Sequence, residues 1–413
     1  MYRKIDKCRI CGNSRLAPVV DLGEQTLTGV FPRKRNQEIS RGPLRLVKCE
    51  NGTDRCGLLQ LQHSYEHNEM YGANYGYRSG INSSMVRHLH DKVETILQLA
   101  RLRSGDLVVD IGSNDGTTLG AFPEDCLLVG IDPTGNKFRE FYRADIRLIP
   151  DFFSAEVVKR AFPGRRAKVV TSFSMFYDLE QPLHFMREVA EVMDDDGIWV
   201  FEQSYMPAML ERNAYDTICH EHLEYYALHQ VQWLVERAGF KILDVEFNDV
   251  NGGSFSVTAA KRASSRPVAT ERIADALERE RAAGLSELAP YVSFARRVEQ
   301  SRDALCRFLQ QARSERKSVF AIGASTKGNV VLQYCGITGK DIAGVGEVNP
   351  DKFGSFTPGT LLPIHPEDEV LARRPDYLLV LPWHFREFFV RNPKFRGFRL
   401  VFPLPTLEQV MVQ

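Results

Sequence analysis

Residues 107–122 read LVVDIGSNDGTTLGAF, and this stretch decides the fold class of the chain. A short apolar run ends in Asp110, and a turn that contains Gly112 and Gly116 follows it. The pattern predicts a buried strand, a tight glycine turn and the start of a helix. Glycines at such a turn let the backbone approach a ligand at the mouth of a parallel sheet. The turn lacks the G-x-G-x-x-G spacing of dinucleotide-binding folds.

Three further apolar runs continue the strand pattern along the chain. LLVGID ends in Asp132, KVVTSFSMF spans 168–176 and GIWVFEQSY spans 197–205. A helix is expected around 180–193, between the last two runs. Strands that alternate with helices of this length specify a doubly wound parallel sheet, so we expect an α/β fold.

The glycine turn and the acidic residue that ends the next strand together resemble the S-adenosylmethionine site of Rossmann-like methyltransferases. In such a site Asp132 would bind the ribose hydroxyls, and Gly112, Asn114 and Gly116 would line the methionine part. The candidate cofactor contacts are Asp110, Gly112, Asn114, Gly116, Asp132, Pro133 and Ser174. The alternatives are another nucleotide ligand or a turn with a purely structural role.

Four of the eight cysteines lie within the first 56 residues. They form two pairs, a C-x-x-C pair and a pair separated by six residues, so residues 50–55 would have to bulge outward. Four thiolates complete a closed tetrahedral zinc site, which is structural because no position stays open for a substrate. The candidate zinc ligands are Cys8, Cys11, Cys49 and Cys56. The alternatives are a reduced cluster without metal and a mixed site that uses His63 or His67.

Length and charge limit the classes of partner. The chain has 413 residues, which predicts two to three structural units. Its 53 Lys and Arg balance 53 Asp and Glu, which argues against the broad basic face that nucleic acid or an anionic membrane requires. No long apolar run or secretory signal is visible, so we expect a cytoplasmic protein that binds neither nucleic acid nor membrane.

A dense group of ionisable side chains precedes an expected helix in the middle of the chain. Residues 213–226 read NAYDTICHEHLEYY, and ALHQVQWLVERAG follows. The spacing is not that of an H-E-x-x-H zinc helix. An acid–base role is the favoured interpretation, and a polar helix start capped by Asp216 or Thr217 is the alternative.

The motifs occur in the order seen in the sugar C-methyltransferase family, and the resemblance covers nearly the whole chain. They are the four-cysteine head, VDIGSNDG, the HEH element, VNGGSFSVT (250–258), GASTKGNVVLQYCGI (323–337) and PGTLLPI (358–364). That family methylates nucleotide-linked ketosugars for antibiotics and bacterial surface polysaccharides. The resemblance implies a zinc-binding head, a methyltransferase core with a Rossmann-like fold and a C-terminal Rossmann-like domain that holds the nucleotide sugar.

The resemblance also implies roles for residues of the middle segment. His222 stands where the family has its proposed general base, with Glu221 beside it, and Tyr75 and Tyr77 match a segment that faces the active site. Cys219 replaces a tyrosine and Asp178 replaces a histidine, two departures that weaken transfer of the detailed mechanism. The candidate catalytic residues are His222, Glu221, His220, Cys219, Tyr77, Tyr75 and Asp178.

The last third of the chain predicts two helices within 268–316, joined near LAPYV, and then a second strand, glycine turn and helix. The turn at 323–328 offers backbone N–H groups and one lysine at a helix N-terminus, which suits a sugar-nucleotide pyrophosphate. The alternative is a glycine that serves only packing. The candidate substrate contacts are Ser325, Lys327, Asn329, Asn251, Glu347 and His384.

These expectations combine into one domain organisation. It comprises a zinc-binding domain at 1–70, a methyltransferase domain at 71–265, a helical connector at 266–316 and a nucleotide-sugar-binding domain at 317–413. The expected activity is S-adenosylmethionine-dependent methylation of a nucleotide-linked ketosugar, at a carbon next to the keto group, by a monomer or homodimer with structural Zn²⁺. The alternatives are O- or N-methylation of a nucleotide sugar or related acceptor, and a non-catalytic nucleotide-sugar-binding protein.

Overall fold

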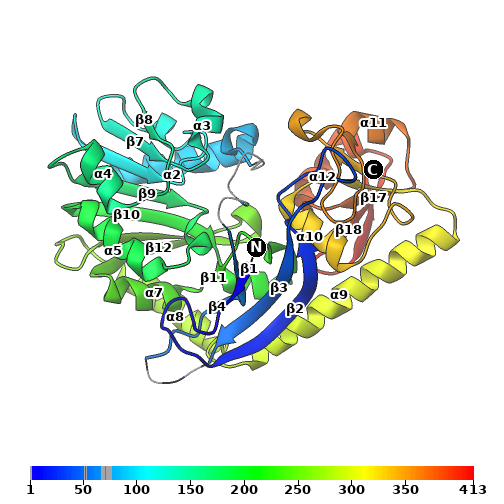
Figure 1. Cartoon of the computed structure of the whole chain (residues 1–413), viewed down its shortest axis with the longest axis horizontal. Coiled ribbons are helices and arrows are strands. Elements are labelled where there is room, and N and C mark those ends of the chain that lie inside the picture. Colours follow the sequence, from blue (N-terminus) through cyan, green and yellow to red (C-terminus); the bar gives the residue numbers. More distant parts are fainter. Residues whose placement is uncertain (1, 51, 53, 67–69, 71–76) are drawn as a thin grey trace.

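The computed structural model describes residues 2–50, 52, 54–66, 70 and 77–413. Two α/β lobes lie on either side of a small N-terminal sheet, and one long helix runs along the molecule between them (Figure 1). None of the helices in the described part of the chain is long and apolar enough to cross a membrane. The α/β fold class expected from the sequence is confirmed.

The first lobe is built on a seven-stranded sheet with the order β12-β13-β10-β9-β6-β7-β8. Strands β10, β9, β6, β7 and β8 run parallel, as predicted, whereas β13 is antiparallel to both of its neighbours. The strands are β6 (Leu107–Ile111), β7 (Leu127–Ile131), β8 (Arg147–Ile149), β9 (Ala167–Phe173), β10 (Met193–Ser204), β12 (Phe240–Asn248) and β13 (Ser254–Lys261).

Both faces of this sheet are covered, and its central strands β6 and β9 are buried at nearly every position. Leu107 and Val109 of β6 face a core that includes α4 (Ala155–Ala161), α5 (Pro182–Val192) and α7 (Leu228–Arg237). Val108 of β6 faces the opposite core, which includes α2 (Ser83–Ala100). Successive side chains of a strand point to opposite faces, so the apolar run fills two cores at once.

One predicted helix start is wrong. The glycine turn after β6 leads to a single 3₁₀ turn, η2 (Leu119–Ala121), and not to a longer helix. Pro123 explains this ending, because a proline disfavours helical backbone in the residue before it. The helix expected after the HEH segment is present as α7, which begins at Leu228. The segment itself contains the 3₁₀ turn η5 (Tyr215–Thr217) and the short strand β11 (Glu224–Tyr225), so the alternative of a polar helix start capped by Asp216 or Thr217 is wrong.

The N-terminal sheet has the order β11-β4-β3-β2, so a strand from the HEH segment completes it. Its strands besides β11 are β2 (Leu16–Thr26), β3 (Arg41–Cys49) and β4 (Leu59–Leu61), and β1 (Tyr2–Lys4) pairs with β5 (His63–Tyr65). The long β2–β3 hairpin reaches the C-terminal lobe (Figure 1), where the side chain of Gln333 bonds both backbone groups of Thr26 at 2.8 and 3.1 Å.

The predicted pair of helices within 268–316 is present as α8 (Thr270–Ala282) and α9 (Ala289–Ser314). The C-terminal lobe that follows has a six-stranded sheet with the order β16-β15-β14-β17-β18-β19, parallel except for β19. Its elements are β14 (Val319–Ile322), α10 (Thr326–Tyr334), β15 (Val345–Glu347), β16 (Ile364–Pro366), α11 (Glu367–Ala372), β17 (Tyr377–Val380), α12 (Arg386–Arg391), β18 (Arg399–Phe402) and β19 (Glu408–Met411).

Candidate active site and zinc centre

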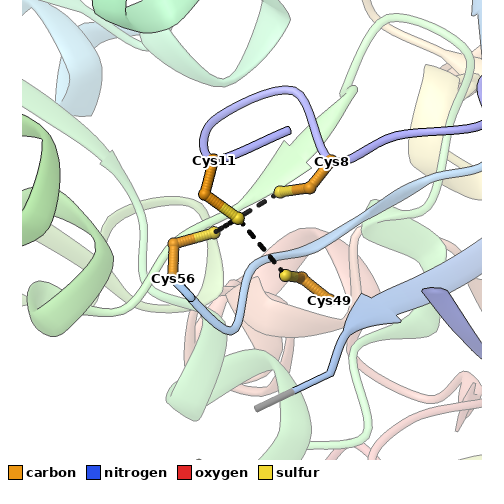
Figure 2. A group of neighbouring side chains, drawn as sticks. All are labelled: Cys8, Cys11, Cys49 and Cys56. Atoms are coloured by element: carbon orange, nitrogen blue, oxygen red, sulfur yellow. Dashed lines mark hydrogen bonds between the residues drawn. The ribbon is translucent and has the colours of Figure 1, made fainter. Parts of the chain in front are cut away.

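The four N-terminal cysteines converge on one point (Figure 2). The sulfur atoms all lie within 4.8 Å of one another, and the Cys8–Cys56 and Cys11–Cys49 pairs are 3.4 and 3.5 Å apart. Zn–S bonds of about 2.3 Å in a tetrahedron require sulfur separations of roughly 3.8 Å, so the cluster fits zinc after a small expansion. No histidine belongs to this cluster among the described residues, and His67 lies outside them.

Two buried polar side chains fasten the cysteine cluster to the rest of the molecule. The side-chain amide of Asn13 lies 3.3 Å from the Cys49 sulfur and 3.1 Å from the Glu50 carbonyl oxygen. Lys48 donates to the carbonyl oxygen of Ser286, at 3.1 Å, just before α9. Its burial lowers the pKa of Lys48, and carbonyl oxygens take the place of water around the ammonium group. Lys48, next to the candidate ligand Cys49, therefore ties the head to the start of α9.

The glycine turn after β6 leaves no room for side chains at its base. A Cβ on Gly112 would lie 3.0 Å from Met175, and one on Gly116 would lie 2.9 Å from the ring of Tyr142. Gly112, Asn114 and Gly116 all have positive φ, at 75°, 50° and 77°. Such backbone is costly for residues other than glycine and asparagine. The loop thus has the close-approach geometry that a bound nucleotide requires, which fits S-adenosylmethionine.

Asp132 follows β7 and fixes this loop. Its Oδ2 accepts a 2.8 Å hydrogen bond from the backbone of Asn114, and its Oδ1 accepts one of 2.7 Å from the backbone of Thr134. Oδ1 also accepts a 2.6 Å bond from the hydroxyl of Thr134, whereas Oδ2 keeps a second lone pair for a ribose hydroxyl. Pro133 lies between these residues. Asp110 lies within β6, where it accepts a 2.6 Å bond from Thr171, and burial raises the pKa of Asp110 to about 7.

The segment after residue 76 is tied to the same loop. The side chain of Asn114 accepts a 2.9 Å bond from the backbone of Ser79 and donates one of 3.2 Å to the carbonyl of Tyr77. Tyr77 is 49% exposed, and Tyr75 lies outside the described residues. Ser174, which follows β9 with φ of 55°, donates its backbone N–H to the carbonyl of Glu202 at 2.8 Å.

His222 lies in the turn before β11, where its ring has a fixed orientation. Its Nδ1 is 2.9 Å from the carbonyl oxygen of Thr217, so Nδ1 carries the hydrogen and Nε2 keeps the lone pair. The ring of Tyr177 packs edge-on against it, with ring centroids 4.4 Å apart. Burial, reinforced by the nearby charge of Lys327, lowers the pKa of His222 to about 4. A neutral imidazole with one accepting nitrogen can act as a base.

The sequence neighbours of His222 lie in other surroundings. His220 is fully buried against the head, with its ring 4.7 Å from that of Tyr65, and burial lowers its pKa to about 4. Cys219 is also fully buried, and burial raises the pKa of its thiol, with the charges of Glu221 and Asp178 adding to the shift. Cys219, Glu221 and Asp178 therefore share one region, whereas His220 belongs to the packing between the two sheets.

Glu221 meets both the head and the C-terminal lobe. A Cβ on Gly29 would lie 2.6 Å from Oε1 of Glu221 and 3.6 Å from the hydroxyl of Thr326, the first residue of α10. Asn329, which is fully buried in α10, holds this loop by a 2.8 Å bond to the carbonyl of Thr28. Burial raises the pKa of the Glu221 carboxyl. Asn329 thus anchors the loop that limits the position of Glu221.

Lys327 lies where the two lobes meet. Its ammonium group donates a 2.8 Å hydrogen bond to the carbonyl oxygen of Asn251, which has φ of 55°. Lys327 lies near His384, where burial and then the lysine charge lower the pKa to about 3. Asp216 is buried nearby and accepts a 2.9 Å bond from the indole of Trp383. The structure thus brings together Lys327, Asn251 and His384 from separate predicted motifs.

Two other predicted substrate contacts have partners within the C-terminal lobe. The carboxylate of Glu347 accepts backbone N–H bonds from Ala324, Val348 and Asn349 at 2.9, 2.7 and 3.0 Å. Ser325 caps α10 by accepting a 3.0 Å bond from the backbone of Gly328. Glu347 therefore joins the glycine turn to the end of β15.

Sequence reasoning missed several groups that shape the site. Tyr177 packs on His222, Tyr142 donates a 2.8 Å bond to the carbonyl of Asn114, and Gly29 abuts Glu221. Lys352 donates a 2.7 Å bond to the carbonyl of Ala324, beneath the second glycine turn. These residues approach the site through long-range packing, and local spacing carries no signal for them.

Comparison with known proteins gives three consecutive family matches. They are a zinc binding domain at residues 8–71, a methyltransferase domain at 83–245 and a C-methyltransferase C-terminal domain at 249–405. Two solved structures are similar over part of the chain. The CcbJ methyltransferase of Streptomyces caelestis has 12% identity and a TM-score of 0.34, over 43% of this chain and 90% of that one. YcgJ of Bacillus subtilis has 15% identity and a TM-score of 0.33, over 42% and 100%.

A curated relative matches nearly from end to end. C-methyltransferase NovU of Streptomyces niveus is 31% identical over 412 residues, which cover 98% of this chain and 97% of NovU. The order of the three family matches follows the order of the head, the first lobe and the C-terminal lobe. The chain therefore belongs to the family of S-adenosylmethionine-dependent C-methyltransferases that includes NovU and carries a zinc-binding N-terminal domain.

Proposed function

We propose that the protein methylates a nucleotide-linked ketosugar at a carbon next to the keto group, with His222 as the general base. The observation that carries this proposal is the neutral, oriented ring of His222, whose Nδ1 is held by the carbonyl of Thr217 at 2.9 Å. A C–H next to a ketone is weakly acidic, so a base must be held close to it. When bound, S-adenosylmethionine supplies an electrophilic methyl group.

His222 and the residues around it have different proposed roles in the reaction. His222 Nε2 takes the proton from the sugar carbon, while Tyr177 packs on the ring and limits its rotation. The positive charge of Lys327 favours the negative charge that develops on the keto oxygen. Glu221 orients the acceptor from the side of Gly29.

The glycine turn and the C-terminal lobe would bind the two substrates. Asp132 would bind the ribose of S-adenosylmethionine and the glycine turn its methionine part. Ser325 and Lys327, at the N-terminus of α10, would hold the pyrophosphate of the sugar nucleotide, because a helix N-terminus and a lysine both favour an anion. Holding both substrates in one orientation would account for much of the increase in the rate of methyl transfer over the uncatalysed reaction.

Methyl transfer from labelled S-adenosylmethionine to a panel of nucleotide sugars tests this function. We expect a radioactive product with at least one ketosugar nucleotide, and His222→Ala should abolish turnover while S-adenosylmethionine affinity stays within about threefold. Turnover that survives in H222A would remove His222 from the reaction. Binding of sugar nucleotides without any product, S-adenosylhomocysteine included, would instead indicate a non-catalytic binding protein.

A further inference from the structure

Glu224 is a buried carboxylate for which the proposed reaction has no use so far. It is the first residue of β11, two positions after His222, and it is 1% exposed. Its Oε2 accepts a 2.8 Å hydrogen bond from the hydroxyl of Tyr226. Its Oε1 is buried and makes no hydrogen bond to any residue that the structure describes. A carboxylate oxygen in that state is costly, which calls for a functional explanation.

A small, largely enclosed cavity lies between Glu224 and His222. Both residues line it, together with Thr217, Ser204, Tyr225 and Tyr177 and the apolar Met206 and Met209. The space admits about one water molecule, and a buried water needs two to four polar partners. The imidazole, the carboxylate and the neighbouring hydroxyl groups can supply these partners.

Two further charged groups, Arg9 and Glu180, act on Glu224. The guanidinium group of Arg9, whose side chain is 2% exposed, lowers the pKa of Glu224 and lies 3.5 Å from the carboxylate of Glu180. The side chain of Glu180 is 24% exposed and pairs with the exposed Arg3 at 3.8 Å. Arg9 therefore pairs with Glu180, an acid that reaches water, and also acts electrostatically on Glu224.

We propose that Glu224 receives the proton that His222 removes from the sugar carbon, through a water molecule in the cavity that the two side chains share. This proposal rests on the proposed role of His222. The C–H bond breaks, its electron pair stays on the sugar, and the proton moves to Nε2. Nε2 then passes a proton to the water, which gives one of its own to Glu224. His222 is then neutral again, and Glu224 releases its proton to solvent before the next turnover.

The electrostatics of the two groups favour this direction of transfer. Burial and Lys327 lower the pKa of His222 to about 4, so its protonated form is a strong acid. Burial raises the pKa of Glu224, and Glu180 adds to that shift, while Arg9 and the bond from Tyr226 oppose it. The two shifts therefore place a proton more stably on Glu224 than on the imidazole of His222.

Pre-steady-state kinetics of Glu224→Gln test the relay. The variant keeps the size of the side chain and an acceptor for Tyr226, but it cannot take up a proton. With the nucleotide sugar that accepts label in the panel, we expect a burst of about one methyl group per enzyme at the wild-type rate. The steady rate that follows should be about tenfold lower, so kcat falls while kcat/KM stays unchanged, and added formate should restore part of it.

Other outcomes of this experiment have distinct meanings. A steady rate equal to that of wild type would overturn the relay, and so would loss of the burst, which would place Glu224 in the chemical step or in folding. Tyr226→Phe removes the hydrogen bond to Glu224 but leaves its carboxylate, so it should keep the steady rate within about twofold. If wild-type protein methylates no nucleotide sugar, the proposed function has failed before the relay is tested.

Discussion

The ammonium group of Lys327 donates a 2.8 Å hydrogen bond to the backbone carbonyl oxygen of Asn251. Lys327 belongs to α10 of the C-terminal lobe, and Asn251 belongs to the connection between β12 and β13 of the first lobe. One positive charge thus joins the two lobes next to the candidate base. The bond fixes where that charge stands relative to His222, and this relationship has consequences that kinetics can measure.

Lys327→Met should move the acidic limb of the pH profile of kcat/KM to higher pH. The pKa of His222 is lowered to about 4 by burial first and by Lys327 second. Removal of the lysine charge makes imidazolium less unfavourable, so the pKa rises toward its ordinary 6.5 by about one unit. His222 must be neutral to act, so activity should then be lost from a higher pH downward. Lys340→Met, at an exposed position, is the control, and an unshifted limb in K327M would contradict this placement.

Gly29→Ala should slow turnover without affecting the cofactor site. A Cβ there would lie 2.6 Å from Oε1 of Glu221, so the carboxylate has to move. A misplaced group beside the base costs catalysis, and we expect kcat to fall about tenfold while S-adenosylmethionine affinity is unchanged. Gly339→Ala is the matched control, since no atom lies within 4 Å of a Cβ at that position. Wild-type kcat in G29A would mean that Glu221 has no positional role.

Gly116→Ala should weaken S-adenosylmethionine binding by about tenfold in a calorimetric titration. The new methyl group would press on the ring of Tyr142 at 2.9 Å, and the backbone has φ of 77°. Gly164→Ala separates the strain of a positive φ from the clash with a neighbouring ring. Gly164 has φ of 73°, but nothing lies within 4 Å of a Cβ at that position. G164A should lose stability but bind normally. Equal affinity of G116A and wild type would place the cofactor elsewhere.

Cys49→Ala should remove zinc from the protein and destabilise the head. The four thiolates lie within 4.8 Å of one another, and three of them cannot close a structural site. Since metal binding contributes directly to folding, we expect less than one zinc per chain by elemental analysis and a lower Tm for the first unfolding transition. Cys126→Ala, a buried cysteine outside the cluster, should keep its zinc. A full zinc content in C49A would exclude Cys49 as a ligand.

Local sequence patterns predicted the parts of the molecule that depend on local chemistry. The C-x-x-C spacing of Cys8 and Cys11 places two sulfurs on one turn, and the structure adds Cys49 and Cys56 despite their wider gap. The apolar run of β6 is buried at every position, as a strand covered on both faces must be.

The sequence could not reveal contacts that depend on how the lobes meet. Nothing near Gly29 in the chain indicates that Glu221 packs against it, 192 positions later. No local pattern indicates that Glu224 lies in a short strand that completes the N-terminal sheet. His220 and His222 are two positions apart in the HEH motif, yet the turn places them in different surroundings, which only the folded backbone determines.

The central claim is carbon methylation of a ketosugar nucleotide with proton removal by His222. One NMR experiment tests it most directly. S-adenosylmethionine with a ¹³C-labelled methyl group is supplied with a ketosugar nucleotide that carries deuterium on the carbon next to the keto group. The account predicts a product in which the labelled methyl group is bonded to that carbon and the deuterium is gone, and no product with H222A. A labelled methyl group on oxygen or nitrogen, with the deuterium retained, would contradict it.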